Sequence, residues 1–154
     1  MRAVDYITNG FGAPIQTATQ GTYGTPAGKL LERAGLDHSF APAFTATINQ
    51  RGVAGIDQAI NFFSRYDQSR DALMQMLYQS NWSLGGLRGK DATYEAVRRI
   101  LNSIASQVGT NPLINELRNR ILNAITNSQG EEYKFMLGYV GTAVEPLRKL
   151  RSLL

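Results

Sequence analysis

The chain has 154 residues, 43% of them hydrophobic, and contains no cysteine. This length can bury the core of one domain, and the lack of cysteine excludes disulfides, cysteine-ligated metals and thiol catalysis. The formal net charge is +4, from 16 basic and 12 acidic residues, and a modest excess rich in arginine is compatible with a phosphate-bearing partner. Neither a signal-peptide pattern nor an apolar run of membrane-spanning length is found, so we expect a soluble, unprocessed protein.

The N-terminal segment, residues 6–28, has no charged side chain and reads YITNGFGAPIQTATQGTYGTPAG. This segment has three interpretations: a disordered tail, an independent subdomain, or an arm that is ordered by what it touches. The large apolar residues spaced along it are unlike a polar linker, and too few recur regularly to form a separate core. We therefore expect an assembly arm ordered by neighbouring copies, nucleic acid or both, with Tyr6, Phe11, Ile15 and Tyr23 as its anchors.

A short helix is predicted over residues 26–34. Thr25 precedes it as a cap, Pro26 suits its first position and Gly35 follows as a stop. Residues 44–48 are the only short alternating candidate for a strand. We predict that residues 1–50 form an assembly or nucleic-acid-wrapping arm that includes this short helix, and that residues 51–154 form a helical bundle.

The bundle is expected to open with a long helical stretch. Residues 52–81 carry apolar side chains at helical spacing and form either one bent helix or two helices joined at the polar residues 64–71. The ten residues NWSLGGLRGK at 81–90 contain three glycines in five positions. This spacing excludes a helix and predicts a tight turn or a small hairpin.

Three further segments complete the predicted bundle. Apolar residues recur at alternating spacings of three and four over residues 91–108, and Asn111 can cap the helix that follows, which Gly130 ends. Residues 131–154 form the final helix, which Pro146 should kink. The predicted fold class is therefore all-α, a four-helix bundle preceded by an extended N-terminal arm with a short helix.

The sequence contains no pattern typical of an enzyme. His38 is the only histidine, and Asp37 and Ser39 are its immediate neighbours, which cannot easily converge on its ring. A phosphate-binding loop of the GxxxxGK[ST] type is absent, and no opposed acidic pair lies on the apolar stripes. We expect a protein that is not an enzyme and that holds no cofactor or metal.

The glycine-rich turn has two interpretations. Trp82, Arg88 and Lys90 place an aromatic ring and two cations beside flexible backbone amides, which can clamp a phosphate. Alternatively, the turn only connects two helices and Trp82 closes the end of the core. We retain Arg88 and Lys90 as candidate nucleic-acid contacts.

The cations near the polar residues 64–71 also have two interpretations. Arg65 and Arg70 interrupt the apolar stripe, as side chains facing a partner would, and Arg51 precedes them. However, Asp67 and Asp71 lie within ion-pairing reach at helical spacing. The remaining arginine pairs are expected to form solvated faces or intersubunit ion pairs: Arg98 with Arg99, and Arg118 with Arg120.

Three segments share a layout with a known group of proteins: the arm at residues 6–28, TPAGKLLERAG at 25–35 and GVAGIDQAINFFSRY at 52–66. This layout resembles that of the major coat proteins of filamentous and rod-shaped archaeal viruses, the lipothrixvirus, rudivirus and tristromavirus group. The resemblance implies a dimer, often with a paralogous coat protein, whose N-terminal helical segments wrap double-stranded DNA in the A form. It implies stacking into a helical filament, sometimes beneath a lipid envelope. The cations that it would turn toward phosphates are Lys29, Arg33, Arg51, Arg65 and Arg70.

From these observations we expect a structural major coat protein of a virion. It would self-assemble as a homo-oligomer or heterodimer and package nucleic acid, with double-stranded DNA favoured, through sequence-independent phosphate contacts. The alternative is a self-assembling helical filament or adaptor protein that binds no nucleic acid, in which the arm inserts into a neighbour and the charges form ion pairs.

Overall fold

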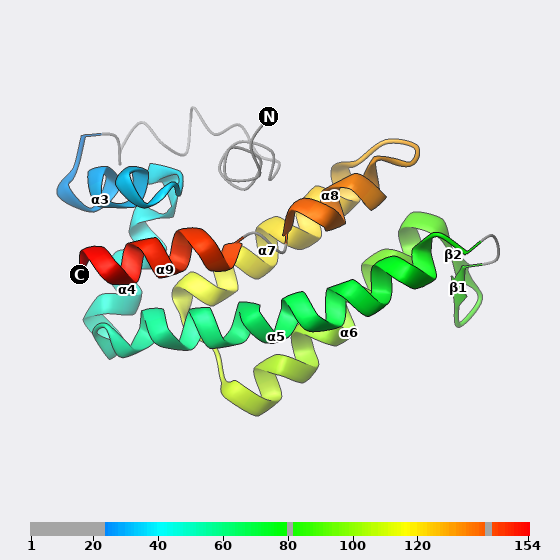
Figure 1. Ribbon diagram of the computed structural model, residues 1–154, viewed down its shortest axis with the longest axis horizontal. Coiled ribbons are helices and arrows are strands. Elements are labelled where there is room, and N and C mark those ends of the chain that lie inside the picture. Colours follow the sequence, from blue (N-terminus) through cyan, green and yellow to red (C-terminus); the bar gives the residue numbers. More distant parts are fainter. Residues whose placement is uncertain (1–23, 80–81, 141–142) are drawn as a thin grey trace.

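The computed structural model describes residues 24–79, 82–140 and 143–154, with backbone alone at residues 136 and 138–140. These residues form an all-α protein with one minimal hairpin, as the sequence predicts (Figure 1). The elements, labelled as in Figure 1, are α3 (Pro26–Ala34), η1 (His38–Phe40), α4 (Ala41–Arg51), α5 (Ala54–Leu77), β1 (Ser83–Leu84), β2 (Leu87–Arg88), α6 (Gly89–Val108), α7 (Pro112–Asn127), α8 (Glu132–Val140) and α9 (Val144–Leu153).

Thr25 and Asn111 cap the starts of the helices that the sequence assigns to them, whereas α6 begins at Gly89, with Asp91 in its first turn. The Thr25 hydroxyl oxygen accepts a 3.0 Å hydrogen bond from the Gly28 amide at the start of α3. The Asn111 side-chain oxygen accepts a 2.9 Å bond from the Ile114 amide at the start of α7. Each cap satisfies a backbone donor that has no partner within its helix. Gly35 ends α3 with φ 93°, in the left-handed region that glycine enters most easily.

Residues 44–48 are helical, so the candidate strand is wrong. They lie within α4, whose buried positions include Phe44 and Thr47. Because Ala41, Phe44 and Thr47 recur at helical spacing, one face of α4 is buried, whereas a strand would bury every second residue. Leu31, Phe40 and Phe44 belong to the same hydrophobic cluster as the later helices. Residues 26–51 are thus part of the common core, and the anchors at 6, 11, 15 and 23 lie outside the described residues.

Helix α5 is continuous from Ala54 to Leu77, so the polar residues 64–71 are one stretch of a single helix. Its buried aromatic side chains explain why it does not break there. Phe62 and Phe63 lie 4.9 Å apart between ring centroids, and Phe63 and Tyr66 lie 6.4 Å apart in an edge-on arrangement. This packing extends the buried face of α5 into the polar stretch.

The glycine-rich turn forms the small hairpin. β1 and β2 pair antiparallel, with Ser83 opposite Arg88 and Leu84 opposite Leu87. Gly85 and Gly86 link the strands with φ 56° and 86°. Two consecutive positive φ angles match the two-residue hairpin turns, which strongly favour glycine.

The sequence predicts a single kinked helix over residues 131–154, but the structure has two helices, α8 and α9, in this region. α8 ends at Val140 and α9 begins at Val144, so Pro146 lies in the first turn of α9. A proline there loses no intrahelical hydrogen bond, because the first turn has no acceptor for its amide. A new helix, α9, therefore starts just before the proline. Its buried stripe consists of Val144, Leu147 and Leu150.

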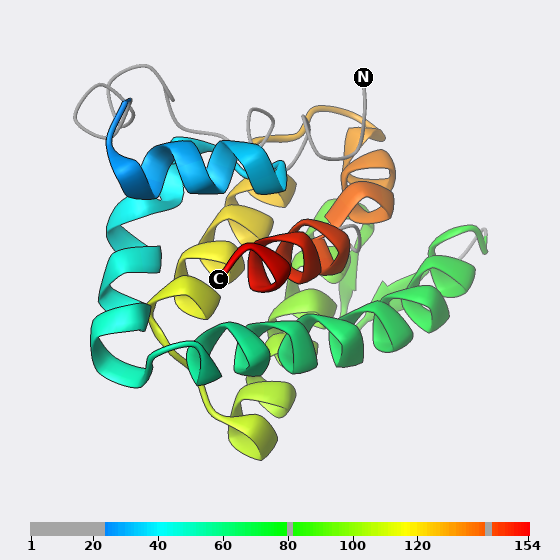
Figure 2. The same ribbon diagram turned by 60° about the vertical axis from the view of Figure 1, so that its left-hand side comes forward.

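The helices pack in an order that differs from their order in the chain. α5 lies along α6 and also contacts α9, while α9 packs on α3 and α4 packs on α7 (Figures 1 and 2). Along the longest axis, α3 and α4 lie at one end, and the hairpin lies at the other with the start of α8 nearby (Figure 1). The long helices α5, α6 and α7 connect these two ends.

Candidate nucleic-acid interface

A groove of about 420 Å³ runs between α5 and α6. Residues three and four positions apart share a helix face, so each helix contributes one row of side chains. The α5 row is Arg65, Gln68 and Ser69, and the α6 row is Arg99, Ile100, Ser103, Ile104 and Gln107. The lining contains two arginines, several neutral polar groups and no carboxylate, so the groove is suited to a polar anion.

Arg65 is held in place without being neutralised. Its Nη1 donates a 2.9 Å hydrogen bond across the groove to Gln107 Oε1, and its Nε donates a 3.4 Å bond to Asn61 Oδ1 on its own helix. Both acceptors are uncharged, and Arg65 forms no ion pair with any carboxylate of the described residues. The exposed guanidinium therefore keeps its full positive charge in a defined position.

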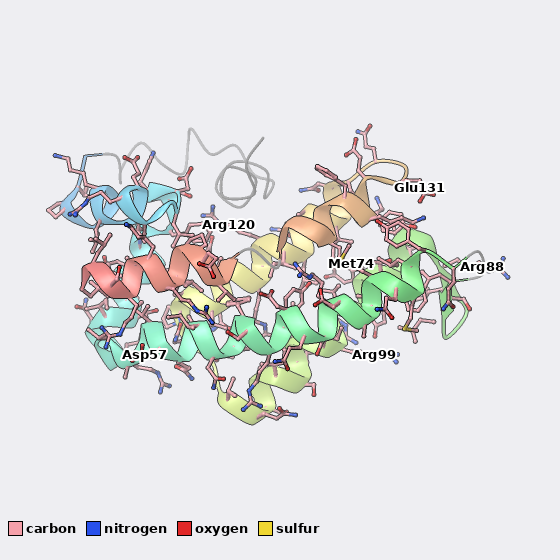
Figure 3. All side chains as sticks on the ribbon, in the orientation of Figure 1. Asp57, Met74, Arg88, Arg99, Arg120 and Glu131 are labelled. Atoms are coloured by element: carbon pink, nitrogen blue, oxygen red, sulfur yellow. The ribbon has the colours of Figure 1, made fainter. Side chains whose placement is uncertain are left out.

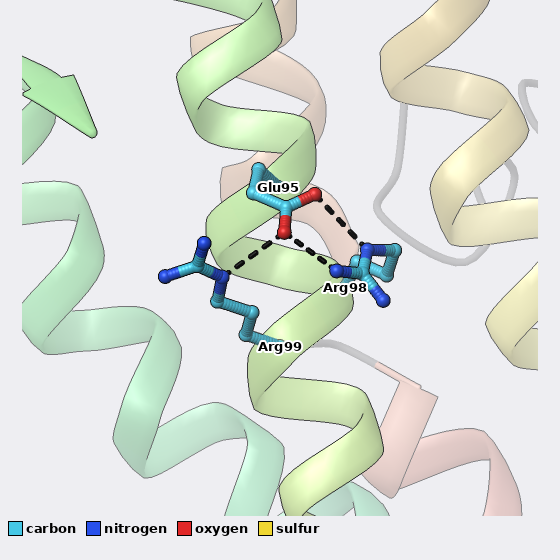
Figure 4. A network of polar contacts seen from close by, with 3 residues as sticks. All are labelled: Glu95, Arg98 and Arg99. Carbon is cyan, nitrogen blue, oxygen red and sulfur yellow. Dashed lines mark hydrogen bonds and ion pairs between the residues drawn. The ribbon is translucent and has the colours of Figure 1, made fainter. Parts of the chain in front are cut away.

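The second arginine of the groove belongs to a charge cluster on α6 (Figure 4). Glu95 accepts bonds from Arg98 at 2.5 and 3.0 Å and from the Arg99 Nε at 3.0 Å. The hydrogen bonds from Arg98 and then Arg99 lower the pKa of Glu95 to about 2, so the carboxylate stays ionised. One acid is shared by two cations, which leaves one net positive charge beside the groove. The sequence predicts either solvated faces or intersubunit ion pairs for these arginines, and the structure forms the pairs within the chain.

Arg70 does not join Arg65. Five positions along a helix correspond to a rotation of about 140°, so the two side chains point in different directions from α5. Arg70 is largely buried and lies 3.1 Å from Asp71 Oδ1. Burial raises the pKa of neighbouring Tyr66 and Asp67, and the positive charge of Arg70 opposes both shifts. Arg70 thus belongs to the interior side of α5.

The other predicted phosphate contacts lie at the two ends of the molecule. Lys29 and Arg33 are exposed on α3, and Arg51 is exposed at the end of α4. Arg88 is exposed on the hairpin at the opposite end, whereas Arg99 lies beside α5 midway along the molecule (Figure 3). The structure therefore does not bring the predicted set together into one patch.

Lys90 has a structural partner. Its ammonium group donates hydrogen bonds of 3.1 and 2.9 Å to the carbonyl oxygens of Thr126 and Ser128. These carbonyls lie at the C-terminal end of α7, where the backbone acceptors lack partners within the helix. Trp82 is partly buried against the core, as expected if it closes the core end.

Sequence reasoning missed the neutral side chains of the groove. Gln68, Ser103 and Gln107 received no role, although Arg99, Ser103 and Gln107 recur every four residues along one face of α6. That spacing was the available signal. The spacing does not show which face of α5 lies opposite these residues, because the packing between the two helices decides that.

The described residues contain no group of three or more histidine, aspartate or glutamate side chains that could hold a metal ion. His38 lies 3.7 Å from Glu32 Oε1, and the Asp37 carboxylate accepts a 2.7 Å bond from the Ser39 amide. Asp37 is therefore used as a backbone cap. No described helix is both long and apolar enough to cross a membrane.

Comparison of the chain with protein-family models, with curated proteins and with solved structures finds no match in any of the three.

Proposed function

We propose that this chain is a structural coat protein that self-assembles into a helical filament and packages nucleic acid through its phosphates. The observation that carries the proposal is the α5–α6 groove, in which the positioned and uncompensated guanidinium of Arg65 faces neutral hydrogen-bonding groups. Arginine suits phosphate because its planar fork offers several donors. A groove without carboxylates adds no repulsion toward a polyanion.

The rest of the groove fits a contact that is independent of base sequence. Serine hydroxyls and glutamine amides, such as those of Ser69, Ser103 and Gln68, can donate hydrogen bonds to phosphate and sugar oxygens. Such contacts position a nucleic acid without reading its bases. Double-stranded DNA in a virion is the partner that the resemblance to archaeal virus coat proteins favours.

In this proposal the long helices serve as the scaffold. α5, α6, α7 and the α8–α9 pair form the four-helix bundle, and the N-terminal residues form the arm that contacts neighbouring subunits. The subunit partner is a second copy or a paralogous chain. The exposed cations of α3 and α4, Lys29, Arg33 and Arg51, extend the phosphate-contacting surface beyond the groove.

The test is a comparison of Arg65→Gln with Arg118→Gln. Arg118 is a matched control, because amide oxygens also hold its guanidinium, 2.7 Å from Asn102 and 3.5 Å from Asn115, but outside the groove. Binding of a mixed-sequence 30-base-pair duplex is followed by fluorescence anisotropy over a range of salt concentrations. We expect Arg65→Gln to weaken binding several-fold and to reduce the slope of log K against log salt by about 1.

Arg118→Gln should leave that slope close to the parent value. Equal effects of the two substitutions would mean that only total charge matters and would exclude the groove as the contact. Duplex binding that is absent at low salt would overturn the proposed packaging function. A switch in preference between two unrelated duplex sequences would contradict sequence independence.

A filament that binds no nucleic acid is the second candidate. The observation that favours it is the concentration of exposed apolar side chains at one end of the molecule, which suits contacts between proteins. Assemblies from the natural source separate the candidates. Nuclease sensitivity and a raised ratio of absorbance at 260 to 280 nm would support packaging, and a ratio typical of pure protein would support the second candidate.

A further inference from the structure

Exposed large apolar side chains gather on the last turn of α5, the hairpin and α8. Tyr78 is 68% exposed, Phe135 53%, Met76 44% and Leu87 40%. Within the described residues, Leu154 at 45% is the only other large hydrophobic side chain that is exposed. We call Met76, Tyr78, Leu87 and Phe135 the end surface. An apolar concentration of this kind marks a site for contact with another protein segment.

The end surface surrounds a polar cleft of about 360 Å³. Each of its four residues is adjacent in sequence to a residue that lines the cleft: Leu77, Gln79, Arg88 and Lys134. Trp82 Nε1 is buried at the cleft and has no hydrogen-bond acceptor among the described residues. Lys134 Nζ pairs with Glu131 at 2.7 Å and lies 5.8 Å from the centre of the Tyr78 ring. An occupant of this region therefore needs apolar groups together with hydrogen-bonding groups.

The segment of residues 6–23 has this composition. It contains no charge, so burying it incurs no cost for desolvating an ion. Its large apolar residues are Tyr6, Ile7, Phe11, Ile15 and Tyr23, and amide and hydroxyl side chains lie between them. The amide oxygens can accept hydrogen bonds from the exposed guanidinium of Arg88. The hairpin also offers strand edges with no further strand paired to them among the described residues, to which an extended segment can add.

The geometry of the molecule indicates which copy supplies the segment. The described chain begins at Gly24, before α3, at the opposite end of the long axis from the hairpin (Figure 1). The eighteen residues 6–23 span at most about 65 Å when fully extended, which is enough to reach across a neighbouring subunit's surface. A contact that joins opposite ends of two identical subunits is heterologous, and such contacts propagate into open filaments or rings.

We propose that residues 6–23 of one copy dock on the end surface of the next copy and link the subunits head to tail. The inference deepens the proposed function and rests on its self-assembly. It specifies the partner as a second copy of this chain, and it gives the filament a direction. The nucleic-acid groove between α5 and α6 is a separate surface, so the two can fail independently.

Because the chain has no cysteine, introduced thiols report a single contact. Full-length Phe11→Cys, Ile15→Cys and Tyr23→Cys variants are each mixed with a larger, tagged Tyr78→Cys protein and oxidised under mild conditions. We expect a disulfide-linked pair containing one protein of each size for at least one donor position. The control acceptor is Asn119→Cys, which is exposed on α7 and should cross-link at the background rate.

The double variant Ile15→Cys/Tyr78→Cys tests whether the segment returns to its own subunit. A ladder of covalent oligomers supports docking between copies. A cross-linked monomer that migrates faster, with no ladder, overturns the proposal because the segment then covers its own end surface. Cross-linking to Tyr78→Cys no faster than to Asn119→Cys at all three donor positions also overturns it.

A second measurement uses Tyr78→Ser/Leu87→Ser. Both side chains are exposed, so the thermal unfolding of the subunit should be unchanged. Loss of two apolar contacts should raise the concentration at which filaments form by about 100-fold. Filament formation at the parent concentration would contradict the inference. Normal duplex binding without cross-linking rejects the docking alone, and cross-linking without duplex binding rejects the packaging function alone.

Discussion

Asn111 Nδ2 donates a 2.9 Å hydrogen bond to the carbonyl oxygen of Gly55, although 56 positions separate the two residues. The same Asn111 amide donates to Gln58 Oε1 at 3.0 Å, while its oxygen caps α7. The cap side chain therefore connects the start of α7 to the first turns of α5. Thr47 completes the junction, because its hydroxyl oxygen accepts a 2.9 Å bond from the Leu113 amide.

Asn111→Ala should lower the free energy of unfolding by about 2–4 kcal/mol, since it removes a cap and leaves buried polar groups without partners. Urea unfolding followed by circular dichroism measures the change. Asn119→Ala, at an exposed position of the same helix, should stay within about 0.5 kcal/mol of the parent. Equal losses would contradict a special role for Asn111.

Gly55→Ala should destabilise the protein by about 1–2 kcal/mol, although alanine is the better helix former. A Cβ atom at position 55 would collide with the Thr47 Cγ2 methyl group. Thr47→Ser removes that methyl and keeps the hydroxyl. In the Thr47→Ser background, Gly55→Ala should cost much less, as measured by the same unfolding experiment. A cost that is equal in both backgrounds would show that the close approach of α4 and α5 is not its source.

Arg120 on α7 makes two contacts with η1 and one with Glu116 on its own helix. Its guanidinium lies 3.9 Å from the centre of the Phe40 ring, and it bonds at 2.9 Å to both Ser39 Oγ and Glu116 Oε1. Arg120→Lys should cost about 1–2 kcal/mol, because an ammonium group cannot make these planar contacts together. Arg98→Lys, on an exposed pair, should cost less than about 0.5 kcal/mol. Similar unfolding midpoints for Arg120→Lys and the parent would refute this.

Asp67 should make stability depend on pH. Burial raises its pKa from 3.8 to about 6, against the opposing charge of Arg70. The folded protein then binds the proton more tightly than the unfolded chain does, so the free energy of unfolding should fall as pH rises from about 4 to 6. The fall should be about 1–2 kcal/mol, because solvent screens part of the effect.

Asp67→Asn should flatten this dependence and be more stable than the parent at pH 7. Asp91→Asn, at an exposed position on α6, should preserve it. Chemical unfolding at half-unit steps from pH 4 to 8 checks both variants. A stability that rises with pH through this interval in the parent would show that the sign is wrong.

Substitution of Lys90 should destabilise the protein more than substitution of Arg88. Lys90→Gln should cost about 1 kcal/mol of stability, because two carbonyl oxygens at the end of α7 lose a charged donor. Arg88→Gln, on the exposed face of the hairpin, should change stability by less than about 0.5 kcal/mol. Thermal unfolding of the two variants measures this difference, and equal stabilities would refute it.

The sequence by itself determined the local features of this protein. Apolar spacing predicted the helix that became α6, and caps predicted the starts of α3 and α7, because such signals act within a few residues. The paired glycines allowed the hairpin for the same reason. The prediction of a strand at residues 44–48 was wrong, because a short apolar run is compatible with either a strand or a helix and packing against the rest of the protein decides between them.

Tertiary structure alone decided which distant residues meet. Arg65 and Gln107 were visible as separate polar positions, but only the packing of α5 on α6 placed them 2.9 Å apart. Packing between helices also left Arg70 largely buried, and the packing of α6 beside α7 assigned Lys90 to the end of α7. The physical reason is that helical periodicity specifies a buried face but not its partner, which depends on how all the buried faces fit into one core.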